Sequence, residues 1–319
     1  MFENRKIKIA IAGIGGIGGY IGGKLAHYYS LFENVDIIFI AKGDTIKAIE
    51  KSGLELISNE ITYKCKPTLI SNKPDEIGEV DLFILCSKTF SVPSILKEFA
   101  TCLTANSTII TTQNTINGKE TIMPYLSNNS TVLEGCIYIS SSKVSATKIQ
   151  HITAQAKLYF GTEGELNKNG EEIAKILNYA GIDAIYTTNI SRLLWKKFMF
   201  ASPAAIVTAL YQITMAEILE NRETEYLYIN LIAEIMELAK AKDVPVDELT
   251  VLNNISILNN FKGYVKSSFQ LDLENNRHSE INELVKHVIE EAKLFNISTP
   301  FFDKALTELI EKYSLLEIN

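Results

Sequence analysis

The sequence predicts an α/β domain built on a doubly wound sheet, followed by an all-α C-terminal domain. An apolar run at residues 7–12 leads through a glycine-rich turn into a helix-compatible segment at residues 20–29. Further short apolar runs rich in β-branched residues alternate with helical segments, which is typical of parallel strands joined by crossover helices. Later in the chain these runs give way to helical periodicity. We therefore expect a sheet domain over residues 1–188 and a helical domain over residues 189–319.

The glycine-rich turn has the spacing G-x-G-x-x-G, formed by Gly13, Gly15 and Gly18. The order strand, glycine turn, helix is the context of a Rossmann-type dinucleotide-binding unit. There the first glycine permits the tight turn, the second lets the backbone approach the pyrophosphate, and the third lets helix and strand pack closely. The glycines interrupt the apolar run too early for a signal peptide or a membrane span. We therefore expect these glycines to bind a dinucleotide at the helix N-terminus.

The end of the second apolar run, residues 35–40, bears on cofactor choice. NAD-binding folds usually place an acidic residue there, which binds the ribose 2′-hydroxyl. Here the strand is followed by Ala41, Lys42 and Gly43, with no carboxylate at the strand end. We interpret Lys42 as a contact to the 2′-phosphate of NADP(H). Asp44 is the one counter-indication, and a solvated loop lysine is the alternative.

Two later strands end in polar residues that are candidates for ligand contact. Residues 80–86 lead into Lys88, and residues 107–112 lead into Gln113 and Asn114. Ligands in open α/β sheets lie beyond the carboxyl ends of the strands. Lys88 and Asn114 are therefore expected to face the cofactor crevice, and turn residues without a ligand are the alternative.

The remaining elements are expected from shorter signals. In chain order they are a short helix at 45–52 ended by Gly53, extended segments at 54–73, a strand at 131–140, a hairpin of two pieces at about 148–153 and 157–161, a helix at 170–179 and a last strand at 182–186. In the helical domain, residues 217–241 show helical spacing, and Ser279 is a good N-cap candidate. Behind Ser279 we predict one apolar stripe, made of Ile281, Leu284, Val285, Val288, Ile289 and Ala292.

Composition narrows the classes of function. The chain has 319 residues, 46% of them hydrophobic, and a net charge of −7. This charge disfavours a general role on nucleic acid or on an anionic membrane. The four cysteines, Cys65, Cys86, Cys102 and Cys136, show no paired or metal-type spacing. No apolar stretch reaches the roughly 18 residues of a membrane span. We expect a reduced, cytoplasmic protein without a metal site.

The most specific patterns lie in the second half of the chain. Residues 189–198 read N-I-S-R-L-L-W-K-K-F, and residues 267–281 read S-S-F-Q-L-D-L-E-N-N-R-H-S-E-I. The other members of the ordered set are the glycine motif, Lys42, Lys88, the Gln113–Asn114 pair and the I-S-T-P stretch at 297–300. Together they resemble the ketopantoate reductase (2-dehydropantoate 2-reductase) family over nearly the whole chain.

The resemblance implies NADPH-dependent reduction of a 2-keto acid to a 2-hydroxy acid, with 2-dehydropantoate to pantoate, in pantothenate biosynthesis, as the expected reaction. Hydride addition builds negative charge on the carbonyl oxygen, which a positioned ammonium can stabilise and protonate. Carried over from the family, Lys197 is the catalytic proton donor. Glu280 is the second catalytic residue, which positions substrate and lysine and contacts the cofactor. Ser268 would bind the carboxylate side of the substrate, and Lys88 and Asn114 would line the junction of cofactor and substrate.

The sequence departs from the family pattern at the expected substrate face. Asparagines usually stand one and two helical turns after the catalytic lysine, where this chain has Ala201 and Ala205. Ser202 and Thr208 are nearby but are not expected on that face. Because two amides that could bind a hydroxylated substrate are missing, a more apolar 2-keto acid is an alternative substrate. Lys42 stands where the family usually has arginine, so its phosphate contact would be less bidentate.

Other interpretations stay open. An opine-type dehydrogenase is the nearest enzymatic alternative, and a non-catalytic NADP(H)-binding sensor is the alternative of another class. The active site is expected in the cleft between the two domains, a preferred place for ligand sites. The expected partner is a small-molecule 2-keto acid, with no nucleic acid and no membrane. Apolar helices in the second domain make a homodimer possible.

Overall fold

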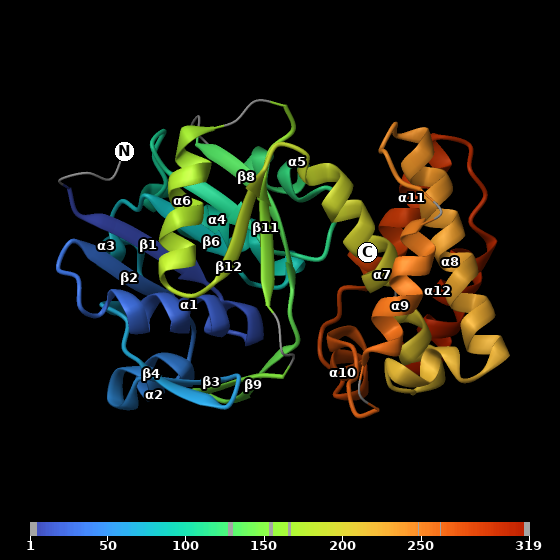
Figure 1. Ribbon diagram of the computed structural model, residues 1–319, viewed down its shortest axis with the longest axis horizontal. Helices are drawn as coiled ribbons and strands as arrows, with labels where there is room; N and C mark the ends of the chain where they lie inside the picture. The colour runs from blue at the N-terminus through green and yellow to red at the C-terminus, as the bar shows by residue number, and fades with distance from the viewer. Residues whose placement is uncertain are drawn as a thin grey trace. The chain divides into compact units, whose positions relative to one another are not determined.

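The computed structural model describes residues 5–126, 130–152, 156–164, 167–247, 249–261 and 263–315. The chain divides into two compact units, coloured along the sequence in Figure 1. The sheet unit comprises Met1–Gln113 and Asn117–Ile190, and the helical unit comprises Asn114–Ile116 and Ser191–Asn319. Each unit has its own hydrophobic core.

The sheet unit is built on an eight-stranded sheet of order β12-β11-β8-β7-β6-β1-β2-β5. Neighbouring strands pair in parallel except for β11 with β8, so β11 and β12 run opposite to the other strands of the sheet. The bounds are β1 Ile7–Ala12, β2 Val35–Ile40, β5 Leu69–Ser71, β6 Leu82–Leu85, β7 Thr108–Thr111, β8 Thr131–Tyr138, β11 Lys157–Gly161 and β12 Asp183–Thr187. The predicted Rossmann-type doubly wound sheet is confirmed, with β1 at its centre between β2 and β6.

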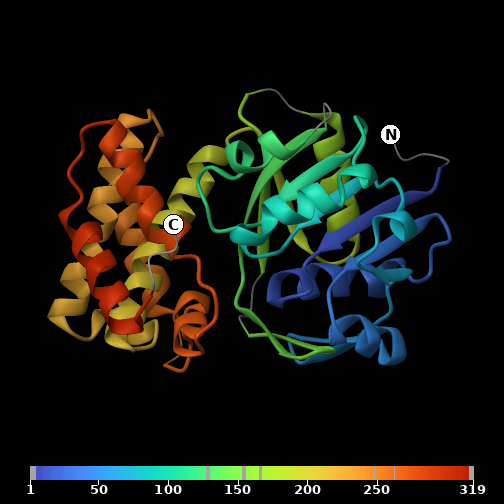
Figure 2. The same cartoon turned by 180° about the vertical axis from the view of Figure 1, so that it is seen from behind.

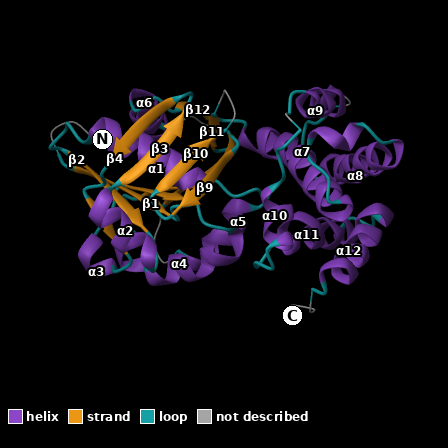
Figure 3. Cartoon of the chain, turned by 90° about the horizontal axis from the view of Figure 1, so that it is seen from below, coloured by secondary structure: helices purple, strands orange, loops and turns teal. Residues whose placement is uncertain are grey.

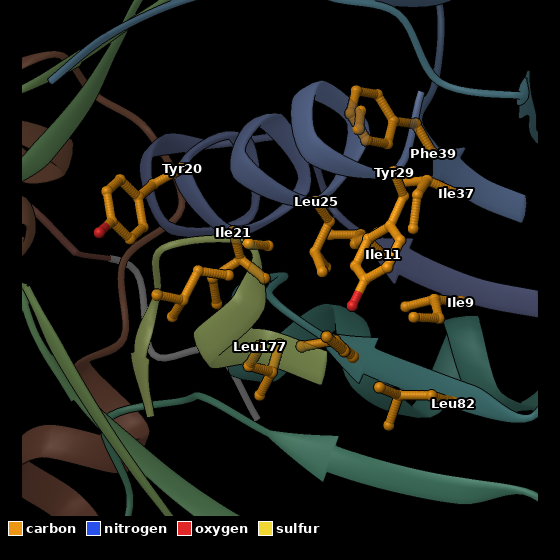
Figure 4. Packing of buried hydrophobic residues seen from close by; sticks show 14 of the residues in the cluster. Ile9, Ile11, Tyr20, Ile21, Leu25, Tyr29, Ile37, Phe39, Leu82 and Leu177 are labelled. Atoms are coloured by element: carbon orange, nitrogen blue, oxygen red, sulfur yellow. The ribbon is translucent and has the colours of Figure 1, made fainter. Parts of the chain in front are cut away.

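Helices cover both faces of this sheet, as Figures 1 and 2 show from opposite sides. On one face, Ile9 and Ile11 of β1 pack with Leu25 and Leu177, shown close by in Figure 4. On the other face, Ala10 of β1 lies in a second core. Burial on both faces explains the nearly continuous apolar strands. The helices of the unit are α1 Gly16–Tyr29, α2 Asp44–Ser52, α3 Pro74–Ile77, α4 Val92–Glu98, α5 Gly118–Ile122 and α6 Lys168–Tyr179, with short helices η1 Thr89–Ser91, η2 Ala100–Cys102 and η3 Met123–Tyr125.

A second sheet of four strands, ordered β4-β3-β10-β9, packs against α1 (Figure 3). Its strands are β3 Leu54–Ser58, β4 Ile61–Cys65, β9 Ser141–Ser145 and β10 Lys148–His151. The hairpin expected from residues 148–153 and 157–161 is wrong, and residue 153 lies outside the described residues. β10 pairs with β9 and β3, whereas β11 pairs with β8 and β12. Both pieces are strands, as expected, but a short extended pattern does not specify a pairing partner, and the polar β9 gave no strand signal.

The helical unit is formed by α7 Ile190–Tyr211, η4 Ala216–Leu219, α8 Arg222–Ala241, α9 Leu249–Asn259, α10 Ser268–Glu274, the π-helix η5 Asn282–Lys286, α11 His287–Leu294 and α12 Pro300–Tyr313. The predicted stripe from Ile281 to Ala292 is buried in its core. The predicted change from strands to helices is thereby confirmed, although Leu284 and Val285 of the stripe lie in the π-helix, and the predicted fold class holds for both parts of the chain.

Helix α7 is the centre of the helical unit. The expectation that no apolar stretch reaches the length of a membrane span is wrong for this helix, which is long and apolar enough by length and composition, but 78% of its apolar window is buried inside the protein. Core helices of soluble proteins pass the same test. Its burial against the core cluster that includes Tyr228, Leu231 and Phe302 identifies α7 as such a core helix.

Candidate active site

The glycine motif forms the turn from β1 into α1. Gly13 has φ of +99°, and a Cβ there would lie 2.9 Å from the Ser87 backbone nitrogen. A Cβ on Gly18 would lie 1.9 Å from the Gly13 carbonyl oxygen, so helix and turn touch through backbone. Above Gly15, in contrast, a Cβ would meet no atom within 4 Å. The described residues thus leave room over Gly15 for a ligand at the first turn of α1.

This turn fits a pyrophosphate. Helix α1 begins at Gly16, earlier than the predicted residue 20, and its N-cap Gly15 makes no side-chain capping bond. The first N–H groups of a helix have no intrahelical partner and attract anions. Because α1 has no acidic residue in its first turn, nothing there repels a phosphate. The motif therefore provides the donors and the open space that a dinucleotide requires.

Gly15→Ala is expected to fold normally and to bind NADPH more weakly. Gly15 has φ of −94°, which alanine tolerates, and its Cβ would enter only the open space. If a phosphate occupies that space, the methyl group displaces it from charge-assisted hydrogen bonds and raises the Kd about tenfold or more. Thermal melting and fluorescence titration with NADPH check this. Gly263→Ala, also in open space, is the control and leaves affinity unchanged; unchanged affinity in Gly15→Ala contradicts the prediction.

Lys42 lies directly beyond the end of β2 and is exposed. Its Nζ forms an ion pair with Glu98 Oε2 at 3.3 Å, with the two side chains 65% and 37% exposed. Such an exposed pair contributes little free energy, so a phosphate dianion can compete with it. Asp44 is the first residue of α2, where an acidic side chain is stabilised by the helix dipole. The position of Asp44 at the start of α2 thus explains its carboxylate without a contact to the ribose 2′-hydroxyl of NAD.

The ends of β6 and β7 are held together by Gln113. Its Nε2 donates to the carbonyl oxygens of Leu85 at 3.1 Å and Ser87 at 3.0 Å, and its side chain is buried. Lys88 follows, half-buried, directly before the short helix η1. Gln113 therefore fixes the backbone on which Lys88 and Asn114 stand.

Lys197 and Asn114 meet although 83 residues separate them. Lys197 Nζ donates to Asn114 Oδ1 at 2.7 Å, and the lysine is only 9% exposed. Asn114 comes directly after the sheet residue Gln113, yet residues Asn114–Ile116 cluster with the helical unit. The structure thus joins two of the predicted site residues within one unit. A buried ammonium oriented by an amide oxygen is suited to act on a ligand oxygen.

Glu280 stands directly before an irregular helix. It is 6% exposed, and the helical run begins at Ile281, so Glu280 rather than the expected Ser279 precedes it. The next five residues, Asn282–Lys286, form a π-helix. Ser202 Oγ of α7 donates to the Leu284 carbonyl oxygen within it at 2.6 Å. Single π-turns inside helices are frequent at functional sites, and no sequence pattern signalled this one.

Ser268 is the exposed first residue of α10, and its neighbour Ser267 caps that helix. Ser267 Oγ accepts from the Gln270 amide at 3.1 Å and lies 2.9 Å from Thr208 Oγ1. Thr208 comes eleven residues after Lys197, three helical turns, so the two share a face of α7 to within about 20°. The expectation that Thr208 leaves this face is wrong.

Between Lys197 and Thr208 this face of α7 is apolar. Ala201 is half-buried and Ala205 is 4% exposed. Helix α7 therefore bonds to three parts of the helical unit, through Lys197 to Asn114, Ser202 to the π-helix and Thr208 to the start of α10. Among the described residues, no group of three or more His, Cys, Asp or Glu could hold a metal ion.

Comparison with known proteins identifies the family. Residues 9–164 match the model of ketopantoate reductase PanE/ApbA, and residues 189–314 match the model of its C-terminal part. Curated relatives include an uncharacterised oxidoreductase of Bacillus subtilis, 26% identical over 95% of this chain and 98% of the relative. Another is the 2-dehydropantoate 2-reductase of Lactococcus lactis, 24% identical over 95% of this chain and 97% of that enzyme.

Solved structures agree with these matches. The 2-dehydropantoate 2-reductase of Porphyromonas gingivalis is 27% identical, with a TM-score of 0.83 over 96% of this chain and all of that one. A D-mandelate dehydrogenase in complex with NADH and anilino(oxo)acetate shares the fold at 18% identity, with a TM-score of 0.86 over 97% of this chain and 98% of that one. The two family models together cover most of the sequence, so this chain belongs to the ketopantoate reductase family and is an NADP-dependent oxidoreductase.

Proposed function

We propose that this protein reduces a 2-keto acid to the 2-hydroxy acid with NADPH, with Lys197 as the proton donor. The observation that carries the proposal is the buried Lys197 ammonium, held by Asn114 Oδ1 at 2.7 Å. A protein that only senses the nucleotide has no need of an oriented proton donor. The family reduces 2-keto acids, so the chemistry of this group matches the chemistry of the relatives.

Reduction of a ketone places negative charge on its oxygen. When bound, the nicotinamide supplies the hydride. Lys197 Nζ donates to Asn114 Oδ1, which orients the ammonium, and an N–H of that ammonium turned to the ketone oxygen stabilises the developing charge. Lys197 then transfers its proton to that oxygen, which completes the hydroxyl group.

The other site residues have supporting roles in this proposal. Gly13, Gly15, Gly18 and Lys42 hold the dinucleotide, with residues 1–188 as the NADP-binding part and residues 189–319 as the substrate and catalytic part. Lys88 and Asn114 contact cofactor and substrate, Glu280 orients the substrate and Lys197 and contacts the cofactor, and Ser268 binds the substrate carboxylate. We place the enzyme in the cytoplasm, where it acts on a small molecule. We propose a homodimer as its candidate assembly.

The first substrate to test is 2-dehydropantoate, which would place the enzyme in pantothenate biosynthesis. Relatives at 24% and 26% identity carry the name 2-dehydropantoate 2-reductase. The second candidate is a more apolar 2-keto acid. Ala201 and Ala205 favour it, because these two positions offer no side-chain hydrogen bond to a substrate hydroxyl. The dehydrogenase of the same fold that is named for mandelate, an aromatic 2-hydroxy acid, agrees with this second candidate.

NADPH oxidation, followed by absorbance, tests the proposal with 2-dehydropantoate beside a panel of simpler aliphatic and aromatic 2-keto acids. Fast oxidation with 2-dehydropantoate supports the first candidate. Oxidation with only an apolar keto acid supports the second. NADPH binding without turnover on any keto acid overturns the enzymatic proposal and favours a sensor.

A further inference from the structure

Strand β9 runs between two features of the nucleotide-binding part. At its start, Ser141 Oγ donates to the Gly16 carbonyl oxygen at 3.0 Å, and a Cβ on Gly16 would lie 2.1 Å from the Ser141 carbonyl oxygen. Two residues later, Lys143 Nζ donates to Thr45 Oγ1 in α2 at 2.8 Å. Because residues i and i+2 of a strand share a face, both contacts lie on one side of β9. The strand thus connects the glycine turn with the beginning of α2.

The pairing register shows which side this is. Lys143 lies opposite Ile149 in the antiparallel pair of β9 and β10, so the two side chains share a face. Ile149 packs against α1, where a Cβ on Gly19 would lie 2.4 Å from Ile149 Cγ1. Lys143 therefore extends from the face of the small sheet that is turned to α1, and its side chain is exposed there.

Lys42 and Thr45, which accepts the hydrogen bond of Lys143, belong to the same turn of chain. Thr45 comes three residues after Lys42. The Cα atoms of Lys42 and Thr45 are therefore at most about 11 Å apart. Gly43 between them has φ of +61°, and a Cβ on it would meet no atom within 4 Å. The beginning of α2 is therefore flanked by two lysines and has open space at Gly43.

The ammonium of Lys143 is available to an anion. In the part of the chain that the structure describes, no carboxylate forms an ion pair with it, and its hydrogen bond goes to a neutral hydroxyl. Neighbouring protein atoms remove water from it, which lowers the pKa of Lys143. An arriving phosphate would favour the charged form again. A phosphate monoester carries about −1.5 to −2 charges at pH 7, more than one lysine neutralises.

We propose that Lys143 is a second cation of the site for the 2′-phosphate of NADP(H), acting with Lys42 and the Thr45 hydroxyl. The inference rests on the proposed function, which puts NADP(H) on the glycine motif. A single lysine cannot contact a phosphate in the bidentate way that an arginine does. Two lysines from different elements would supply two separate contacts instead. The structural alternative is a lysine that only ties the edge strand β9 to α2 and protects that edge from pairing.

Measurements of nucleotide binding, which need no turnover, distinguish a phosphate contact from a purely structural role of Lys143. Lys143→Met keeps most of the side-chain length and removes the charge. Calorimetric titration compares adenosine 2′,5′-bisphosphate with 5′-AMP, which differ only in the 2′-phosphate, and NADPH with NADH. We expect Lys143→Met to bind the bisphosphate and NADPH about tenfold more weakly, because one charge-assisted hydrogen bond is lost. Binding of 5′-AMP and NADH is expected to stay unchanged. Lys148→Met, which removes an exposed ion pair with Glu55 on the neighbouring strand, is the matched control and changes neither.

The outcomes separate this inference from the proposed function. If the wild type prefers the bisphosphate to 5′-AMP and Lys143→Met keeps the full preference, the inference is wrong and NADPH binding stands. If Lys143→Met weakens both ligands equally and lowers the melting temperature, Lys143 is structural only. If the wild type binds no nucleotide, or shows no preference for the 2′-phosphate, the proposed NADPH function fails first. Lys42→Met losing the same preference as Lys143→Met supports the shared site.

Discussion

Lys197→Ala is expected to lower kcat by about 10²–10⁴-fold, the range that a positioned general acid contributes. The variant removes the ammonium that donates to Asn114 Oδ1. Water that fills the space can donate a proton, but it cannot supply a fixed positive charge to the ketone oxygen. NADPH affinity is expected to stay unchanged, because the proposed phosphate contacts lie on other residues. Stopped-flow NADPH oxidation and fluorescence titration measure the two quantities separately.

The neighbouring lysine provides the control for this experiment. Lys196 precedes Lys197 on the same helix and is half-buried, so Lys196→Ala removes an equal charge from the same turn of α7. It is expected to keep kcat near that of the wild type. Equal losses in the two variants would mean that the charge of α7, rather than a proton donor, matters. Wild-type turnover in Lys197→Ala would exclude Lys197 as the acid.

The parts of the fold that could be predicted are those whose signal is local. The order strand, glycine turn, helix reports one continuous segment, and the steric roles of Gly13, Gly15 and Gly18 follow from backbone geometry alone. The buried stripe from Ile281 to Ala292 is likewise a property of one continuous segment, which forms the π-helix and α11. In both cases the residues that form the sequence pattern also form the structural feature, so the sequence is enough to predict that feature.

The parts that could not be predicted depend on partners far apart in the chain. β9 reads S-S-K-V-S and is polar because it is an edge strand, so its place beside β10 depends on tertiary contacts. Asn114 follows a sheet strand but clusters with the helical unit through bonds such as that to Lys197. The π-helix that follows Glu280 has no residue signature, and its bond to Ser202 spans 82 positions. The family resemblance made Lys197 and Glu280 candidates, whereas the contact that orients Lys197 appears only in three dimensions.

Ala201→Asn is expected to raise the specificity constant for 2-dehydropantoate, relative to an apolar 2-keto acid, by about tenfold or more. Ala201 stands one helical turn after Lys197 and is half-buried, so an amide there can reach a ligand that Lys197 touches. A hydrogen bond to the hydroxyl that an apolar keto acid lacks contributes about 1 kcal/mol net, and an amide left unpaired beside an apolar substrate costs a further 1–3 kcal/mol. Both effects act in the same direction on the ratio of the two kcat/KM values.

Ala201→Leu separates hydrogen bonding from size in this test. Leucine has the same number and branching of side-chain heavy atoms as asparagine but offers no polar atom, so it is expected to lower kcat/KM for 2-dehydropantoate and to spare an apolar substrate that still fits. Steady-state NADPH oxidation with the two substrates measures the ratio for wild type and both variants. If asparagine and leucine shift the ratio in the same direction, steric fit rather than hydrogen bonding governs selectivity at position 201. An unchanged ratio in both would place substrate recognition away from this face of α7, because neither a new amide nor a new aliphatic group would then be felt by the bound acid.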